Sequence, residues 1–180
     1  MPDSTEFSII LYPEPVLRKT ADVVTAFDEH LANTVEAMYE LMFESQGVGL
    51  AGPQVSVRQR ILIMNAESDV EQPELNLTLI NPTVVERTGN KILMEEGCLS
   101  FPGIFAEIRR SENCVVEAVD LEGQPLRVEL TGFQSRVVQH EYDHLEGVLL
   151  VDRMSPADRL RNKTALEELV EAYKEQREQV

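Results

Sequence analysis

A chain of 180 residues, 43% hydrophobic and 27% charged, is long enough for one domain with its own core, and we expect a single domain over residues 1–180. Acidic residues outnumber basic ones by 32 to 16, and the resulting net charge of −16 repels phosphate groups, which argues against binding to nucleic acid or to a membrane surface. No apolar run approaches the ~20 residues of a membrane helix. Because residues 1–10 resemble neither a secretory signal nor a transit peptide, we expect a cytoplasmic protein.

The hydrophobic pattern predicts one helix first and a series of strands after it. Apolar residues spaced three and four apart predict a helix over residues 27–45, which the glycines that follow would end. Gly89-Asn90 is a candidate hairpin turn between two strands, and residues 122–125 form another. Short β-branched or alternating segments predict the strands, over residues 60–65, 77–85, 91–99, 113–121 and 126–130.

Two helical segments are predicted after the strands. The helical period returns over residues 133–145, and Gly147 is placed to end that helix. Ser155 and Pro156 suit the N-cap and the first position of a last helix, which runs polar to the C-terminus. The order of a helix, several antiparallel strands and further helices predicts an α+β fold.

The helix predicted over residues 133–145 contains the sequence HEYDH, which matches the pattern H-E-x-x-H. Residues four apart lie on one helix face, about 5–6 Å from each other, so His140 and His144 can bind the same metal ion. Glu141 can reach the open position of that ion and act as a general base and then as a general acid. The alternative for this motif alone is a pair of solvated histidines on an acidic helix.

A catalytic metal site usually has three protein ligands and one open position. The remaining histidine, His30, lies far upstream and is expected on an exposed helix face. A zinc peptidase with this motif would take its third ligand from downstream, where the chain offers carboxylates such as Glu146 and Asp152. The preferred candidate is Cys98, because it supplies a thiolate. Cys114 lies in an apolar segment and is expected to be a thiol of the core.

Three separate motifs, in this order, are shared with one enzyme family. They are GVGLAGPQ at residues 47–54, EGCLS at 96–100 and QHEYDH at 139–144. In these motifs the chain resembles the peptide deformylases, from about Tyr12 to Met154, and it is especially similar to their plastid-type branch and its bacterial relatives. The resemblance implies antiparallel β-sheets packed around a central metal-binding helix, with N- and C-terminal helices. It also implies a metal-dependent hydrolase that removes the formyl group from the N-terminal formylmethionine of nascent proteins and releases formate.

The resemblance implies that Cys98, His140 and His144 bind one divalent metal ion per chain. Family members are similar in using Fe(II) natively, while Zn(II) or Ni(II) often occupies the purified protein. One cysteine and two histidines also suit zinc, so the residues alone do not choose the metal. Iron with a thiolate ligand would make the enzyme sensitive to oxygen.

For the reaction, the resemblance implies that Glu141 is the general base and acid. The side-chain amide of Gln54 and the backbone N–H of Leu99 would donate hydrogen bonds to the oxyanion, and losing one such donor typically costs ~3 kcal/mol of transition-state stabilisation. Gly49 would lie beside the substrate backbone, where a side chain would block close approach. Gly52 stands where many family members have alanine, a change that would loosen the loop.

The substrate methionine would enter an apolar pocket, for which Val48 and Val137 are the candidate walls; an ordinary core role is the alternative for either. Arg136 precedes the first histidine ligand by four residues, and a buried cation requires a partner. We therefore expect Arg136 either to line the substrate pocket or to pair with a nearby acid. Glu96 and Arg110 are a candidate pair that would hold the cysteine loop; two solvated charges are the alternative.

The expected partners are N-formylmethionyl peptides at the ends of nascent chains. Many bacterial family members are thought to approach the ribosome through a basic C-terminal helix. Here residues 156–180 contain six acidic and five basic side chains, so we expect any ribosome contact to be transient and independent of this helix. Two other functions stay open on the sequence: an endopeptidase with a downstream third ligand, and a metal module with four protein ligands, against which the base Glu141 argues.

Overall fold

The computed structural model describes residues 7–178. Residues 1–6, on which the predicted absence of a signal sequence partly rests, and residues 179–180 lie outside that range. The strands of the described residues form one antiparallel sheet in chain order, so the several sheets expected from the sequence are a single one. Its strands are β1 (Gly49–Ala51), β2 (Ile61–Met64), β3 (Leu77–Glu96), β4 (Ala106–Val119) and β5 (Pro125–Thr131).

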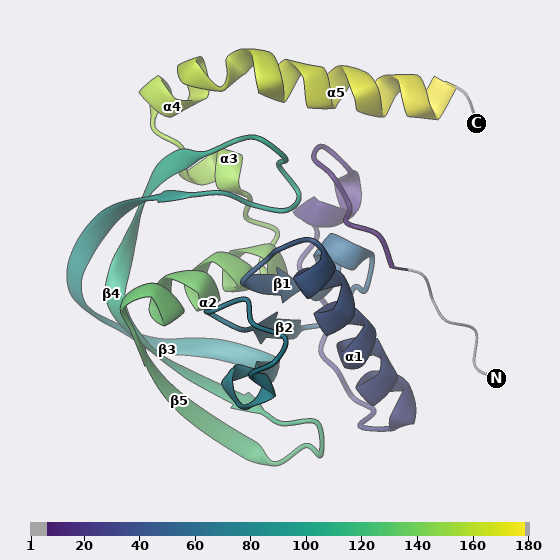
Figure 1. The fold of residues 1–180 in the computed structure, drawn as a ribbon, viewed down its shortest axis with the longest axis vertical. Coiled ribbons are helices and arrows are strands. Elements are labelled where there is room, and N and C mark those ends of the chain that lie inside the picture. The colour runs from purple at the N-terminus through teal and green to yellow at the C-terminus, as the bar shows by residue number, and fades with distance from the viewer. Residues whose placement is uncertain (1–6, 179–180) are drawn as a thin grey trace.

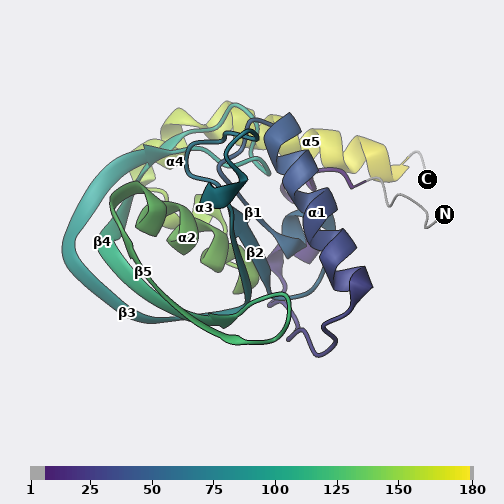
Figure 2. The ribbon, with the colours of Figure 1, turned by 60° about the horizontal axis from the view of Figure 1, so that its bottom comes forward.

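Helix α2 (Gly132–Leu145) lies at the centre of the molecule and contacts every strand of this sheet. The long strands β3, β4 and β5 curve around it, and α1 (Glu29–Glu44) packs beside β1 and β2 (Figures 1 and 2). The chain then continues into α3 (Leu150–Arg153), α4 (Pro156–Arg161) and α5 (Lys163–Glu178), the last of which crosses the top of Figure 1. The predicted α+β fold, with a central helix and helices towards both ends, is confirmed. Among the described residues, no helix has the length and apolarity that crossing a membrane requires.

Helix α1 begins where the sequence predicts it and buries one face. The side chain of its N-cap, Asp28, accepts a hydrogen bond from the backbone N–H of Leu31 at 3.1 Å. The helix ends at Glu44, and Gln46 follows in the left-handed conformation with φ of 56°. Its buried apolar residues pack against β1 and β2 and so support the strand that lies within the first motif; they are Leu31, Val35, Met38 and Met42.

The predicted turn at Gly89-Asn90 is wrong, because β3 continues through it to Glu96. The pairing with β4 shifts register between Thr88 and Lys91, which marks a β-bulge. Gly89 provides the positive φ of 74° that an irregular position of this kind requires. The true connection between β3 and β4 is residues 97–105, and this loop carries the second motif.

Further differences from the predicted elements have local causes. Strand β4 begins at Ala106, seven residues before the predicted start, because the buried Arg110 hides the alternation of apolar and polar residues. Ser155 caps α4 (Pro156–Arg161) as predicted, but Asn162 separates α4 from α5 (Lys163–Glu178), so the predicted last helix is two helices. The short elements β1 and α3 (Leu150–Arg153) were not predicted.

Gly147 ends α2 as the sequence predicts. Its φ is +70°, and the backbone N–H of Val148 donates to the carbonyl of Asp143 at 2.9 Å, which closes the helix end. A Cβ at position 147 would lie 2.5 Å from the backbone oxygen of Arg18. The glycine therefore serves both the turn and the packing of the N-terminal segment against α2.

We expect Gly147→Ala to lower the free energy of unfolding more than Gly103→Ala does. Gly103 has a similar φ of +72°, but among the described residues no heavy atom lies within 4 Å of an added Cβ. Gly103→Ala should lower the free energy of unfolding only by the cost of placing alanine at a positive φ, about 1–2 kcal/mol. Gly147→Ala should lose about 1–3 kcal/mol more, because a backbone atom must move. Urea unfolding of both variants measures the difference, and equal losses would contradict this role of the Arg18 contact.

Candidate functional site

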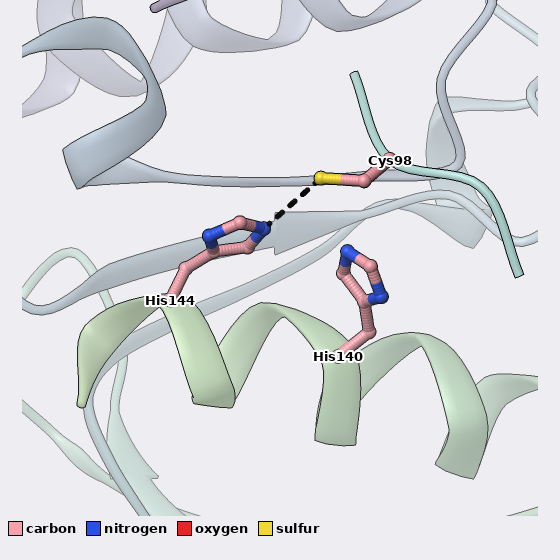
Figure 3. A group of neighbouring side chains, drawn as sticks. All are labelled: Cys98, His140 and His144. Atoms are coloured by element: carbon pink, nitrogen blue, oxygen red, sulfur yellow. Dashed lines mark hydrogen bonds between the residues drawn. The ribbon is translucent and has the colours of Figure 1, made fainter. Parts of the chain in front are cut away.

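Cys98, His140 and His144 come together between α2 and the loop that follows β3. Figure 3 shows the two imidazoles on one side of α2, one turn apart, with the thiol above them. The possible ligand atoms of the three side chains lie within 4.8 Å of one another, and Cys98 Sγ is 3.3 Å from His144 Nε2. A thiolate and two imidazoles at these distances fit a tetrahedral divalent ion with one open position.

The orientation of His140 is fixed by an acid on the neighbouring strand. Its Nδ1 lies 3.0 Å from Oε2 of Glu96, which leaves Nε2 as the nitrogen for a metal. Arg110 donates two hydrogen bonds to Glu96, at 2.6 and 2.9 Å, so the predicted pair is confirmed. Burial alone would raise the pKa of Glu96, but the hydrogen bonds from His140 and Arg110 reverse this effect and lower the pKa to about 2. Glu96 is therefore an anion at neutral pH.

Arg136 was expected either to line a pocket or to pair with an acid, and it does both. Its side chain is buried, and its guanidinium donates to Glu96 and to the carbonyl oxygens of Ile108, at 2.9 Å, and Ile92, at 2.7 Å. Arg136 also lines the cavity described below. The acceptors around its guanidinium mean that the side chain forms a wall of the cavity and does not present a free charge to it.

Glu141 lies next to Cys98, His140 and His144, which form the candidate metal-ligand group, and is 5% exposed. Its Oε2 has no hydrogen-bond partner among residues 7–178. Burial raises the pKa of Glu141 to about 7. A buried carboxyl group of this kind can accept and return a proton near neutral pH.

Gln54 is held with its amide N–H towards the site. It lies in the short 3₁₀ helix η2 (Gly52–Val55), and its Oε1 accepts a hydrogen bond from the backbone N–H of Ala51 at 2.9 Å. Its Nε2 is therefore directed to Cys98 Sγ, at 3.7 Å, and to Ser100 Oγ, at 3.2 Å. The donor that the sequence predicts thus lies beside the metal-ligand group.

A cavity of about 490 Å³ opens onto Cys98, His140 and Glu141. Leu99 and Gln54 are also part of its lining. All the residues predicted to contact substrate line this cavity, namely Val48, Gly49, Arg136 and Val137.

Two glycines of the first motif are required by close contacts. A Cβ at Gly49 would lie 2.8 Å from Glu141 Oε1 and equally close to Val137 Cγ1. A Cβ at Gly52 would lie 2.6 Å from the backbone oxygens of Val57 and Gln59. The expectation that Gly52 loosens its loop is therefore wrong: the glycine lets the following loop pack closely.

Some residues of the site were not identified from the sequence. Asp143 accepts hydrogen bonds from Arg110 at 2.9 Å and from Arg153 at 2.7 and 3.0 Å. Phe105 and Phe133 line the cavity although they are about half exposed. The position of Asp143 within the H-E-x-x-H motif was an available signal, whereas nothing in the sequence pattern marks the two phenylalanines.

The remaining polar candidates lie where the sequence predicts them. His30 is exposed on α1, away from the metal-ligand group. Cys114 is buried in the core between the sheet and α2, with its Sγ 4.0 Å from the carbonyl oxygen of Ser135. Neither residue belongs to the site.

Comparisons with known proteins agree with this geometry. The family model "Polypeptide deformylase" matches residues 7–160. A peptide deformylase of Thermotoga maritima is 43% identical over 168 residues, which cover 93% of this chain and 99% of that protein. "Peptide deformylase 1B, chloroplastic/mitochondrial" of Arabidopsis thaliana is 37% identical over 95% of this chain and 62% of its own length. A crystal structure of peptide deformylase from Plasmodium falciparum superposes with a TM-score of 0.90 at 39% identity, over 93% of this chain and 97% of the other.

The resemblance to plant and bacterial deformylases, which the three motifs predict, is confirmed by these matches. Deformylation of the N-terminal formylmethionine of nascent chains is the activity of that family, and the enzyme class follows from it. A Cys/His/His group that can hold a metal ion is present, as a metalloenzyme requires. The chain belongs to the peptide deformylase family and is a hydrolase that removes the formyl group from nascent proteins.

Proposed function

We propose that Cys98, His140 and His144 hold the metal ion of this deformylase and that Glu141 moves the proton of the reaction. The observation that carries this proposal is the meeting of the three ligand atoms, within 4.8 Å of one another, beside the buried Glu141 in one cavity. A divalent ion bound there would supply a Lewis acid that activates water and polarises the formyl oxygen. Every other role falls to side chains and backbone groups of this chain.

Glu141 takes the proton from the attacking water and returns it to the nitrogen that leaves as the new N-terminal amine. Its free Oε2 supports this role, because a carboxylate oxygen already bound by an arginine would be a weaker base. Its neighbour Glu96 is held by two arginines and His140, which suits it to orient His140 and not to transfer protons.

Gln54 and Leu99 stabilise the negative charge that develops on the formyl oxygen. The amide of Gln54 donates from Nε2, and its orientation is set before substrate binds because Oε1 is bonded to Ala51. The backbone N–H of Leu99, next to the ligand Cys98, is the second proposed donor. Donors fixed in advance stabilise a transition state without the cost of reorientation.

We expect Gln54→Leu to lower kcat/KM by about 10²–10³, the usual cost of one oxyanion donor. Leucine has a similar volume but no N–H, and the metal ligands are unchanged, so metal content should stay at the wild-type value. Gln134→Leu, at an exposed position of α2, is the matched control and should keep kcat/KM within about twofold. Unchanged turnover in Gln54→Leu would show that the amide is not an oxyanion donor.

The methionine side chain of the substrate enters the cavity between Val48 and Val137, with Arg136 as a further wall. Gly49 lies beside the substrate backbone. The contact that a Cβ at Gly49 would make with Glu141 supports this position, since only glycine leaves room between the base and the first motif. We place the site within one functional domain formed by the whole chain.

We propose Fe(II) as the native metal, because a thiolate with two imidazoles suits a soft or borderline divalent ion and the family resemblance implies iron. Turnover that is faster with Fe(II) than with Zn(II) under nitrogen, and that is lost in air, would support this choice. Equal rates and stability in air would exclude it.

The proposed substrates are nascent chains in the cytoplasm, reached through a transient ribosome contact. Helices α4 and α5 lie in the near-neutral C-terminal segment, so they offer little attraction to ribosomal RNA. Ribosome co-sedimentation should therefore be the same after deletion of residues 160–180, and a loss of binding would contradict this proposal.

A further inference from the structure

A buried network of charged side chains surrounds His140, and only part of it is explained by metal ligation. Glu96 lies at its centre, 7% exposed, between the guanidinium groups of Arg110 and Arg136, each 5% exposed. Its two oxygens are shared among Arg110, Arg136 and His140. A buried carboxylate needs partners to stay ionised, but Arg110 and His140 already provide them. The second arginine therefore calls for its own explanation.

Arg136 joins two structural units that each carry metal ligands. It projects from α2, four residues before His140, whereas Glu96 ends β3 two residues before Cys98. The same guanidinium also donates to Ile92 of β3 and to Ile108 of β4. One side chain thus connects the helix of the two histidines with both strands of the hairpin that carries the cysteine.

Arg110 connects the same two units at a different place. It lies on β4, so its bonds to Glu96 stay within the hairpin, and it reaches α2 through Asp143, at 2.9 Å. Asp143 follows His140 by three residues, while Arg136 precedes it by four. The hairpin is therefore attached to α2 on both sides of His140. On the N-terminal side, Ser135 and Gln139 donate to the carbonyl oxygen of Ser111 in β4, at 3.3 and 2.8 Å, and Arg136 makes the bonds to Glu96 and Ile92 of β3.

We infer that Arg136 is a positioning residue of the metal centre, which sets the distance between the thiol and the imidazoles and holds Glu96 against His140. This inference rests on the proposed metal site. Partners that orient a metal ligand typically change metal affinity by about 10- to 100-fold when they are removed. Arg136 acts through Glu96 and two carbonyl groups and need not touch the substrate to have this effect.

The expected result is a weaker metal site in a folded protein. Arg136→Met keeps the length and the apolar stem but removes every donor, and it should raise the Zn(II) dissociation constant by about 10- to 100-fold. Arg136→Lys keeps the charge but loses the planar fork, so it should fall between Arg136→Met and the wild type. Arg127→Met is the matched control, because Arg127 pairs with Glu86 and Glu117 on the exposed face of the sheet. Its dissociation constant should equal the wild-type value.

The experiment uses Zn(II)-loaded full-length protein, equilibrated with a chromophoric chelator, and circular dichroism to verify folding. Glu96→Gln and the double variant that combines it with Arg136→Met complete a double-mutant cycle. Because Arg136 acts through Glu96, the loss of affinity in the double variant should be smaller than the sum of the two single losses in free energy. A readout of metal affinity separates positioning from a general loss of stability, which would leave the metal affinity of the folded fraction unchanged.

Two results would overturn the inference: a folded Arg136→Met variant whose dissociation constant is within twofold of the wild type, or fully additive effects of Arg136→Met and Glu96→Gln. If Arg136→Met does not fold, Arg136→Lys decides, and wild-type affinity in that variant rejects the inference. The proposed metal site has its own check in the same assay. Wild-type metal affinity in Cys98→Ala would reject that site and the inference with it. If Cys98→Ala loses metal affinity while Arg136→Met keeps it, only the role of Arg136 is rejected.

Discussion

Glu141→Gln is expected to lower kcat/KM for a formylated peptide by about 10²–10⁴, the usual contribution of a positioned general base and acid. Glutamine has almost the same volume as glutamate, so the buried side chain should keep its packing between Gly49 and the metal-ligand group. The glutamine amide cannot accept the proton from water. Metal content should stay at the wild-type value, because Glu141 is not one of the ligand-forming residues.

The measurement is formate release at saturating and limiting substrate, with metal content determined on the same samples. Glu146→Gln is the matched control: this residue caps the end of α2, is partly exposed and pairs with Arg60 at 2.7 Å. We expect its turnover within about twofold of the wild type, as for most surface substitutions. Full activity in metal-loaded Glu141→Gln would mean that another group moves the proton.

Cys98→Ala should remove the metal from the protein. A direct ligand contributes more than an outer hydrogen-bond partner, so the dissociation constant should rise by more than the ~100-fold upper value for such partners. Two imidazoles on one helix would remain, and they form an incomplete site for a catalytic ion. Cys114→Ala is the control, because this thiol is buried in the core away from the ligand group and should leave metal content unchanged.

The same variant distinguishes the endopeptidase alternative, which needs a third ligand downstream of the helix motif. Metal retained in Cys98→Ala would support that alternative. The downstream carboxylates are engaged elsewhere: Glu146 pairs with Arg60, and Asp152 pairs with Arg18 and accepts from the backbone of Leu149. A module with four protein ligands is likewise disfavoured, since the ligand group among the described residues has three members.

The metal-ligand helix was predictable from the sequence because its information is local. The spacing of His140 and His144 fixes their common face, and Gly147 marks the end of the helix by its conformational freedom. Cys98, the proposed third ligand, could be chosen only by counting donors and by family resemblance. Its position depends on the pairing of β3 with β4, which spans residues far apart in the sequence.

The network around His140 was only partly predictable for the same reason. Arg110 makes the first part of β4 read as a polar segment in the sequence, although the side chain is buried. Its burial depends on Glu96 and Asp143, which come from two other elements. The bulge at Gly89 resembles a hairpin turn, because glycine serves both structures. Local patterns therefore identified the helices and their caps, whereas long-range pairing decided the sheet register and the contacts of the arginines.

Formate release from formyl-Met-Ala-Ser by the Fe(II)-loaded protein under nitrogen tests the central claim most directly, with Glu141→Ala measured beside it. The wild type should release one formate for each new amino terminus, and the variant should release formate at least about 10²-fold more slowly with its metal still bound. No formate from wild-type protein whose metal is verified as bound would contradict the assignment of both the reaction and the site.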